Sequence, residues 1–144
     1  MSLTSRTIEA ACHCGNIRYA LQWPEEAFPI TVRECGCSFC QKHGGVYTSH
    51  PQSELHIEIL DSDKVSAFRF GHETADFNFC AVCGSLMYVI CPLEGNNYAV
   101  VNVNNWENIS QDELIHSNTD FDAETVDSRL ERRKKNWIPK LVFS

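Results

Sequence analysis

Seven of the eight cysteines lie in three short clusters, a pattern that points to chemistry at sulfur. The clusters are Cys12-x-Cys14, Cys35-x-Cys37-x-x-Cys40 and Cys80-x-x-Cys83, and Cys91 stands alone. Cysteines separated by one residue rarely pair with each other, because disulfide geometry fixes the distances between their Cα and Cβ atoms. In a reducing compartment, clustered thiols are more often metal ligands. Metal binding is therefore the leading interpretation, with long-range disulfides and unligated redox thiols as alternatives.

A count of ligands predicts two metal sites of different kinds. Sulfur-only tetrahedral ligation suits zinc or an iron–sulfur cluster, and the spacings differ from those of ferredoxins. The two doublets together supply four thiolates, which is a closed structural set, whereas the triplet supplies three and leaves the open position of a catalytic site. Alternatively, a fourth ligand closes the triplet, and the candidates are Cys91, His43 and His13.

The composition is that of an ordinary globular domain. The chain has 144 residues, of which 43% are hydrophobic and 22% charged, so we expect one domain over residues 1–144. The formal charge of −7 argues against nucleic-acid binding, which needs a basic surface. No apolar run approaches the length of about 18 residues that spans a membrane, and the N-terminus lacks a secretory signal. We therefore expect a cytoplasmic protein without membrane contact.

Alternation of apolar and polar residues predicts a mainly β fold with few short helices. The period of two is seen at residues 17–23, 55–59, 75–79, 86–90 and 98–103. The cysteine clusters fall between such runs, where Gly15 and Gly84 suit tight turns around a metal. A capping-box sequence at residues 110–113 predicts a short turn through Ile115, and residues 123–136 can form a charged helix.

The C-terminal residues combine a basic run with an apolar segment. The basic residues are expected on a solvated helix face, with binding of a partner as the alternative; they are Arg129, Arg132, Arg133, Lys134 and Lys135. The residues between Trp137 and Phe143 are too apolar for a free tail. We expect them to dock on the domain or on a second subunit, which would make the protein a dimer.

The residues around each cluster resemble one enzyme family. Residues 11–19 (ACHCGNIRY), 35–42 (CGCSFCQK) and 79–88 (FCAVCGSLMY) are similar to the three cysteine clusters of the glutathione-dependent formaldehyde-activating enzyme family, also called GFA/CENP-V. All seven clustered cysteines match in order. The resemblance covers roughly residues 7–106, and residues 107–144 form an extension that carries no matching motif.

This resemblance implies a fold, two metal sites and an activity. The implied fold is Mss4-like, in which zinc stabilises antiparallel sheets. A structural zinc would be held by Cys12, Cys14, Cys80 and Cys83, and a second zinc, at the reaction site, by Cys35, Cys37 and Cys40. The family's founding activity joins formaldehyde to glutathione to give S-hydroxymethylglutathione, which is a carbon–sulfur lyase reaction run in reverse.

We therefore expect a zinc-dependent enzyme of the carbon–sulfur lyase type that acts on a thiol–aldehyde adduct. Glutathione or another small thiol would be its co-substrate. The alternative is a non-catalytic, zinc-stabilised protein-binding module of the same fold.

Three residues beside the triplet are candidates for contact with the substrate. Arg33 and Lys42 can bind an anionic thiol, which needs local cations because metal–thiolate sites add negative charge. His43 can act as a general acid or base, since histidine ordinarily titrates near neutrality. For all three residues the alternative is ordinary surface charge.

Overall fold

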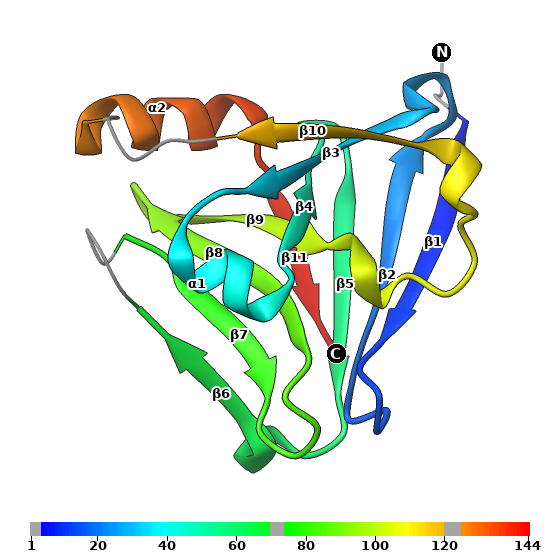
Figure 1. Ribbon diagram of the computed structural model, residues 1–144, viewed down its shortest axis with the longest axis vertical. Helices are drawn as coiled ribbons and strands as arrows, with labels where there is room; N and C mark the ends of the chain where they lie inside the picture. The colour runs from blue at the N-terminus through cyan, green and yellow to red at the C-terminus, as the bar shows by residue number, and fades with distance from the viewer. Residues whose placement is uncertain (1–3, 70–73, 120–124) are drawn as a thin grey trace.

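Two β-sheets form the framework of the computed structural model, which describes residues 4–69, 74–119 and 125–144 (Figure 1). The four-stranded sheet has the spatial order β1 (Ser5–Ala11), β2 (Ile17–Pro24), β5 (Glu54–Ile59), β11 (Lys140–Phe143). The seven-stranded sheet has the order β10 (Leu114–Thr119), β3 (Ile30–Cys35), β4 (Val46–Thr48), β9 (Asn96–Asn102), β8 (Leu86–Leu93), β7 (Asp76–Cys80), β6 (Val65–Phe68). The predicted mainly β fold is confirmed.

Helices are few and short across the described ranges, as predicted. Two α-helices are present, α1 (Ser38–His43) and α2 (Val126–Asn136). The 3-10 turns are η1 (Glu25–Ala27), η2 (Ser62–Lys64), η3 (Val103–Asn105) and η4 (Gln111–Glu113). The capping box at Ser110 forms as predicted and opens η4, but Ile115 then lies in β10.

Most neighbouring strands pair antiparallel, but two pairs are parallel. Strand β10 runs parallel to β3, and β11 runs parallel to β5. Parallel neighbours need a long crossover connection, and here the chain traverses most of the fold before each of these strands returns. As a result, two segments of the C-terminal region complete sheets that begin with N-terminal strands.

Alternation along the strands builds the main core between the two sheets. In β2 the residues Ile17, Tyr19, Leu21 and Trp23 are buried, while Arg18 between them is exposed. They pack with apolar residues of β1 and β5 and with residues of β3, β8 and β9 from the other sheet. Burial of one such large apolar side chain contributes about 1.5–3 kcal/mol, so this face holds the sheets together.

A second apolar cluster joins the seven-stranded sheet to both α-helices. It contains Cys40 of α1, Tyr47 of β4 and Cys91 of β8, with Leu130 of α2 and Trp137 directly after that helix. The cysteines of the triplet are therefore packed in this smaller cluster, apart from the main core between the sheets.

The apolar C-terminal segment docks on its own domain. Trp137 is 6% exposed and Ile138 is fully buried, and Ile138 exchanges backbone hydrogen bonds with Ala99 at 2.8 and 3.0 Å. Strand β11 then completes the four-stranded sheet, leaving Phe143 exposed. The prediction of docking is confirmed for this chain, and dimerisation through the segment stays a prediction.

The charged helix predicted over residues 123–136 is present as α2. Residues 123 and 124 lie outside the described ranges, and Thr125 caps the helix by accepting a hydrogen bond from the backbone N–H of Ser128. The prediction of a fully solvated basic face is wrong at Arg133, which is only 7% exposed. Arg133 lies on the side of the helix that packs against the sheet. Its guanidinium contacts Cys91 of β8 and stacks over the Trp137 ring.

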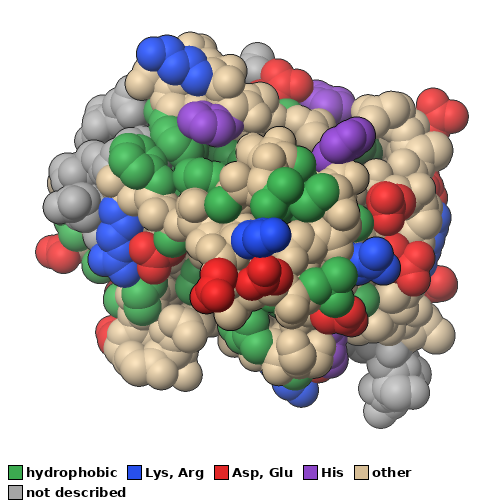
Figure 2. Space-filling model, turned by 90° about the horizontal axis from the view of Figure 1, so that it is seen from below, with side chains coloured by type: hydrophobic (Ala, Val, Ile, Leu, Met, Phe, Trp, Pro, Cys, Tyr) green, Lys and Arg blue, Asp and Glu red, His purple; other side chains and the backbone are tan. Residues whose placement is uncertain are grey.

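The surface seen in Figure 2 mixes hydrophobic, acidic and basic side chains, and basic residues are scattered over that face. The large exposed hydrophobic side chains belong to several separate elements, among them Leu60, Val82 and Phe143. Single apolar residues of this kind are ordinary on a protein surface. Within the described residues, no helix has the length and apolar character needed to span a membrane.

Candidate functional site

The two cysteine doublets meet at one end of the two sheets. Cys12 and Cys14 lie in the turn between β1 and β2, and Cys80 and Cys83 lie at the end of β7 and in the turn before β8. All four sulfur atoms lie within 4.8 Å of one another, although Cys14 and Cys80 are 66 residues apart in the chain. A metal ion bound by the four cysteines would therefore link turns from different sheets.

The spacing of these sulfurs fits zinc. Tetrahedral Zn²⁺ with Zn–S bonds of about 2.3 Å places its sulfur ligands about 3.8 Å from each other. The Sγ atoms of Cys12 and Cys14 are 3.7 Å apart, and those of Cys14 and Cys80 are 3.5 Å apart. This quartet is therefore shaped as a closed site of the structural kind.

The turns that carry the quartet share one backbone design. In the first turn, the N–H of Cys12 donates to the carbonyl of Ile17, and the N–H of Ile17 donates to the Cys12 sulfur at 3.4 Å. In the second turn, the N–H of Cys80 donates to the carbonyl of Ser85. Both turns contain a glycine in the left-handed region, with φ of +84° at Gly15 and +78° at Gly84, where a side chain would be strained.

The thiols of the quartet sit in different electrostatic surroundings. Burial alone would raise the pKa of Cys83, but hydrogen bonds from the side chain and backbone of Ser85 and from the backbone of Cys14 lower it to about 5. A backbone hydrogen bond from Asn16 acts to lower the pKa of Cys14, yet the contact with Cys80, burial and the remaining sulfurs together raise it to about 11. Cys83 is thus the thiol most readily deprotonated for binding a metal.

The cysteine triplet is positioned by the end of β3 and by α1. Cys35 is the last residue of β3, Cys37 is the N-cap of α1, and Cys40 lies within that helix. The backbone N–H of Cys40 donates to the Cys37 sulfur at 3.4 Å, and the three sulfurs lie within 4.8 Å of one another. This set of three, the trio, could hold a metal ion with a position left for another ligand.

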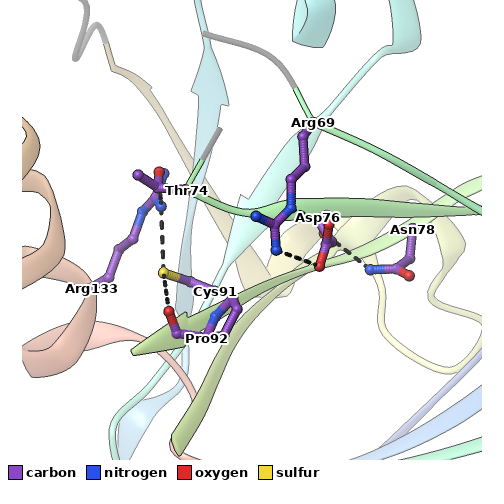
Figure 3. Close-up of polar contacts among 7 residues, drawn as sticks. All are labelled: Arg69, Thr74, Asp76, Asn78, Cys91, Pro92 and Arg133. Atoms are coloured by element: carbon purple, nitrogen blue, oxygen red, sulfur yellow. Dashed lines mark hydrogen bonds and ion pairs between the residues drawn. The ribbon is translucent and has the colours of Figure 1, made fainter. Parts of the chain in front are cut away.

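None of the alternative fourth ligands completes the trio. Within the described ranges, His13, His43 and Cys91 do not join its sulfurs in a set of mutually close ligand atoms. His13 is exposed in the turn of the first doublet. Cys91 is fully buried in β8, where the guanidinium of Arg133 donates to its sulfur at 3.5 Å (Figure 3). Cys91 is thus a buried thiol of the second apolar cluster.

A buried tyrosine that the sequence analysis did not single out lies beside the trio. The Tyr47 hydroxyl is 3.2 Å from the Cys40 sulfur, and the side chain is 6% exposed. Burial, followed by the nearby charge of Cys40, raises the pKa of Tyr47 well above its ordinary value. Tyr47 therefore keeps its proton and can donate a hydrogen bond to the Cys40 thiolate.

The space for Tyr47 depends on Gly45. A Cβ atom at this position would lie 2.7 Å from Cζ of Tyr47 and closer still to its hydroxyl oxygen. The neighbouring Gly44 has a different function, since it ends α1 in the left-handed conformation with φ of +65°. The Gly44-Gly45 pair was the signal in the sequence that could have drawn attention to the residue packed against it.

Two thiols of the trio, Cys37 and Cys40, have pKa values raised by their surroundings. The pKa of Cys37 is raised chiefly by burial. That of Cys40 is raised strongly, first by its hydrogen bond with Cys35 and then by burial. Three sulfurs that share a confined space repel each other as thiolates. The positive charge of a bound cation would offset this repulsion and so favour the deprotonated thiols.

The three candidate substrate contacts lie at different depths. Arg33 is half-buried and donates to the Ser49 hydroxyl at 3.2 Å; burial, with the charge of Arg132, lowers its pKa. Side chains two residues apart in a strand share a face, so Arg33 and Cys35 face the same side of β3. Lys42 and His43 are both exposed at the end of α1.

His43 is held against the first turn of its own helix. Its Nδ1 atom is 3.0 Å from the carbonyl oxygen of Phe39, and its ring stacks on the Phe39 ring at 4.2 Å. A carbonyl can only accept, so Nδ1 carries the proton in this contact, and in the neutral ring Nε2 is then the acceptor. The same Phe39 ring packs on Phe77 at 5.0 Å, which anchors α1 to β7.

A surface pocket of about 610 Å³ lies beside the quartet, not beside the trio. Its walls come from β1, β2 and β5 and include His13, Cys14 and Glu58. A closed set of four thiolates offers no vacant position for a substrate. Of the two sulfur sites, only the trio leaves a position open, and the pocket lies away from it.

The fold is similar to that of a Rhodobacter sphaeroides protein whose crystal structure was determined by a structural genomics programme. The TM-score is 0.56 at 23% sequence identity, and the similarity covers 76% of this chain and 99% of that chain. At this level of identity the likeness shows a shared fold.

The family model described as glutathione-dependent formaldehyde-activating enzyme matches residues 7–121. The match contains the quartet and the trio, and it continues beyond residue 106, where the visible resemblance of motifs stops, to the end of β10. It ends before α2 and β11. The chain therefore belongs to the glutathione-dependent formaldehyde-activating enzyme family.

Proposed function

We propose that this protein is a zinc-dependent enzyme of the carbon–sulfur lyase type. Its reaction would join formaldehyde to glutathione, or another small aldehyde to a small thiol, and would also run in reverse on adducts such as S-hydroxymethylglutathione. Membership of the family supports the substrate class. The quartet and the trio support two zinc ions per chain, one structural and one at the reaction site.

The observation that carries this proposal is the difference between the two sulfur sites. Four sulfurs meet in one site and three in the other. Structural zinc sites are closed by four protein ligands, whereas catalytic sites have three and keep the fourth position for water or substrate. A trio with one position left open, packed beside the buried Tyr47, therefore supports a reactive site more than a structural one.

The residues of the chain prepare the trio for this chemistry. A zinc ion bound there would activate a substrate thiol by lowering its pKa and would act as a Lewis acid. The Tyr47 hydroxyl contacts the Cys40 sulfur, would donate to its thiolate, and so holds it in place from the side of β4. The apolar cluster that contains the trio also includes Phe39, Leu86 and Val89, which would limit the access of water to its buried side.

The reaction requires one proton to leave sulfur and one to reach oxygen. The substrate sulfur attacks the aldehyde carbon, a C–S bond forms, and the electron pair of the C=O π bond moves to oxygen, which then takes up a proton. His43 is the candidate to carry that proton, because its Nε2 is an acceptor on an exposed ring one helical turn after Cys40. In the reverse direction the same proton returns to sulfur as the C–S bond breaks.

An anionic thiol needs cations near the trio, because the protein is acidic overall. Arg33 faces the same side of β3 as Cys35 and is held by Ser49. Lys42 is exposed on α1. We assign Arg33 to the inner and Lys42 to the outer part of the substrate site.

Zinc analysis of the reduced protein tests the proposal first. We expect two zinc ions in the wild type, one in Cys37→Ser, and two in Cys91→Ser, which removes a buried thiol outside both sulfur sites. A wild-type protein with one tight zinc, and with Cys35, Cys37 and Cys40 freely alkylated even after zinc has been added back, would instead indicate the non-catalytic binding module.

A second measurement tests the reaction itself. Formation of the hydroxymethyl adduct from ¹³C-formaldehyde and glutathione can be followed by NMR exchange spectroscopy, with and without the zinc-loaded enzyme. We expect acceleration by the wild type and none above background by Cys37→Ser. Equal exchange rates with and without wild-type enzyme, for glutathione and for cysteine alike, would contradict the proposal.

A further inference from the structure

The short turn η3, directly after β9, is anchored to both sheets. Asn102, the last residue of β9 and the N-cap of η3, is only 3% exposed. Its backbone carbonyl accepts hydrogen bonds from the Tyr19 hydroxyl of β2 at 3.4 Å and from Nδ2 of Asn105 at 3.3 Å. The indole N–H of Trp106 donates to the same tyrosine hydroxyl at 2.9 Å. A turn held in this way by residues of both sheets can serve as a fixed point for a neighbouring loop.

The side-chain amide of Asn102 has a defined orientation. Its Nδ2 donates to the carbonyl of Leu86 at 3.0 Å, and only the nitrogen of an amide group can donate to a carbonyl. The amide oxygen therefore faces the other way, where it accepts from the backbone N–H groups of Val46 and Asn104, both at 3.3 Å. Because Val46 is the first residue of β4, Asn102 holds one end of the loop that connects α1 to β4.

A second asparagine of η3 holds the other end of that loop. Nδ2 of Asn104 donates to the carbonyl of Gly44 at 2.6 Å, and Gly44 directly follows α1 as its C-cap. Gly44 and Val46 flank Gly45, the position at which an added Cβ would collide with the ring of Tyr47. The two asparagines therefore hold the chain on both sides of the glycine against which the tyrosine ring packs.

The pairing of strands places Asn102 directly opposite Tyr47. In the antiparallel ladder of β4 and β9, these two residues are partners, and the side chains of such partners lie on one face of the sheet with Cβ atoms about 4.5–5.5 Å apart. The hydroxyl at the far end of the Tyr47 ring lies 3.2 Å from the Cys40 sulfur. The turn η3 thus fixes both the loop before Tyr47 and the strand position of Tyr47 itself, and Tyr47 in turn contacts the trio.

We propose that Asn102 and Asn104 are positioning residues of the reaction site, which hold the loop between α1 and β4 so that Tyr47 meets the Cys40 sulfur. The inference rests on the proposed function and goes beyond it, because it assigns the geometry of the trio to a turn outside the cysteine pattern. Both asparagines act through Tyr47, and neither is assigned a contact with substrate. Groups that orient a metal ligand tune the affinity of the metal, so a metal ion at the trio should report on this turn.

Zinc binding at the trio tests the positioning role apart from the reaction. Asn104→Ala removes the donor to Gly44 from an exposed position, and we expect the zinc affinity of the trio, measured by chelator competition, to fall about tenfold. Asn104→Gln retains an amide donor and should recover part of this loss. Asn105→Ala is the matched control, because it removes the adjacent asparagine of the same turn, whose Nδ2 donates instead to the carbonyls of Leu86 and Asn102.

Cobalt(II) in place of zinc reports the geometry of the site directly. The visible absorption of thiolate-bound cobalt depends on its ligands and their arrangement, and the difference between wild type and Cys37→Ser gives the signal of the trio. We expect this signal to change in Asn104→Ala and in Asn102→Ala, and to stay as in wild type in Asn105→Ala. Asn104→Ala decides the outcome if Asn102→Ala does not fold, because Asn102 is buried and Asn104 is exposed. A loss of stability alone would lower the melting temperature and leave the spectrum unchanged.

Equal zinc affinities and cobalt spectra in wild type and Asn104→Ala would overturn the positioning role. An equal loss in Asn105→Ala, or no recovery in Asn104→Gln, would overturn it as well. A wild type that binds no metal at the trio would overturn both this inference and the proposed function. The expected changes in a protein whose zinc-loaded wild type forms no adduct would instead overturn the proposed reaction alone and support the role of the turn.

Discussion

The hydroxyl of Tyr47 lies 3.2 Å from the sulfur of Cys40, and both side chains are buried. The contact crosses from β4 to α1, over a loop in which Gly45 leaves room for the tyrosine ring. A group that hydrogen-bonds to a metal ligand orients it and tunes its basicity. Tyr47 is therefore part of the trio's support, although it is not itself in the cysteine pattern.

Replacing Tyr47 by Phe should loosen zinc at the trio while leaving the fold intact. The variant removes the hydroxyl and keeps the ring, so we expect a loss of about 1 kcal/mol in the free energy of unfolding and of about 10–100-fold in zinc affinity at the trio. Chelator competition measures the affinity. Tyr98→Phe is the control, because Tyr98 is in the same apolar cluster without this contact; an equal loss in that variant would contradict the assignment.

Gly45→Ala should disturb the trio more than Gly44→Ala. A Cβ at residue 45 meets the Tyr47 ring at 2.7 Å, and overpacking of this kind costs about 1–3 kcal/mol. Gly44→Ala places alanine at φ of +65° without that clash, and the left-handed strain costs about 1–2 kcal/mol. Both melting temperatures should fall, but only Gly45→Ala should reduce zinc affinity at the trio. Similar affinities for the two variants would show that the Tyr47 contact does not matter.

The sequence was most informative where the pattern is local. Alternation predicted β2, β5, β8 and β9, because a buried face imposes a period of two on the residues themselves. The spacing of cysteines separated a group of four from a group of three, and the structure brings the same groups together. Alternation, the two doublets and the triplet are all visible among neighbouring residues, whereas the joining of the two doublets across 66 residues was indicated by the ligand count and by the family resemblance.

The remaining features of the fold and the site depend on long-range packing, which the sequence pattern does not reveal. Helix α1 has only six residues, too few to show a helical period, so it was not predicted. Tyr47 contacts Cys40 only because the fold places β4 beside α1. Arg133 is buried because α2 packs against β8 and the Arg133 side chain contacts Thr74. In a run of basic residues, the residue types alone do not indicate which arginine faces the protein interior.

Cysteine substitutions at the two sulfur sites should have different effects. Structural zinc contributes about 10–16 kcal/mol in small zinc-finger peptides, which is comparable to the whole net stability of a domain, about 5–15 kcal/mol. Cys83→Ser should therefore unfold the protein, whereas Cys37→Ser should change the melting temperature little and abolish adduct formation. Circular dichroism melts and the exchange assay check both. If the two variants melted alike, the division into structural and reactive sites would be wrong.

The ion pair between Arg6 and Glu113 should make stability depend on acid pH. The hydrogen bond from Arg6, then that from the backbone of Ser110, lowers the pKa of Glu113 from its ordinary 4.5. The pair therefore stabilises the fold at pH above about 4.5, the value in the unfolded chain, and the stabilisation disappears as the pH falls through the lower pKa of the folded state.

Melting temperatures of wild type and Glu113→Gln between pH 7 and pH 3 test this. The difference in melting temperature between wild type and Glu113→Gln should be largest at pH 7 and should vanish at the acid end of this range. Glu107→Gln removes the same charge from an exposed position and is the control. A constant difference across this range would rule out the ion pair as its cause.

The order of strands in the four-stranded sheet has a consequence for biosynthesis. Its outer strands, β1 and β11, come from the two ends of the chain (Figure 1). Until β11 has left the ribosomal tunnel, β5 has an unpaired edge that is open to other nascent chains. Docking of β11 is thus the step that seals this sheet, and a change that kept β11 from reaching β5 would leave that edge open in the finished protein.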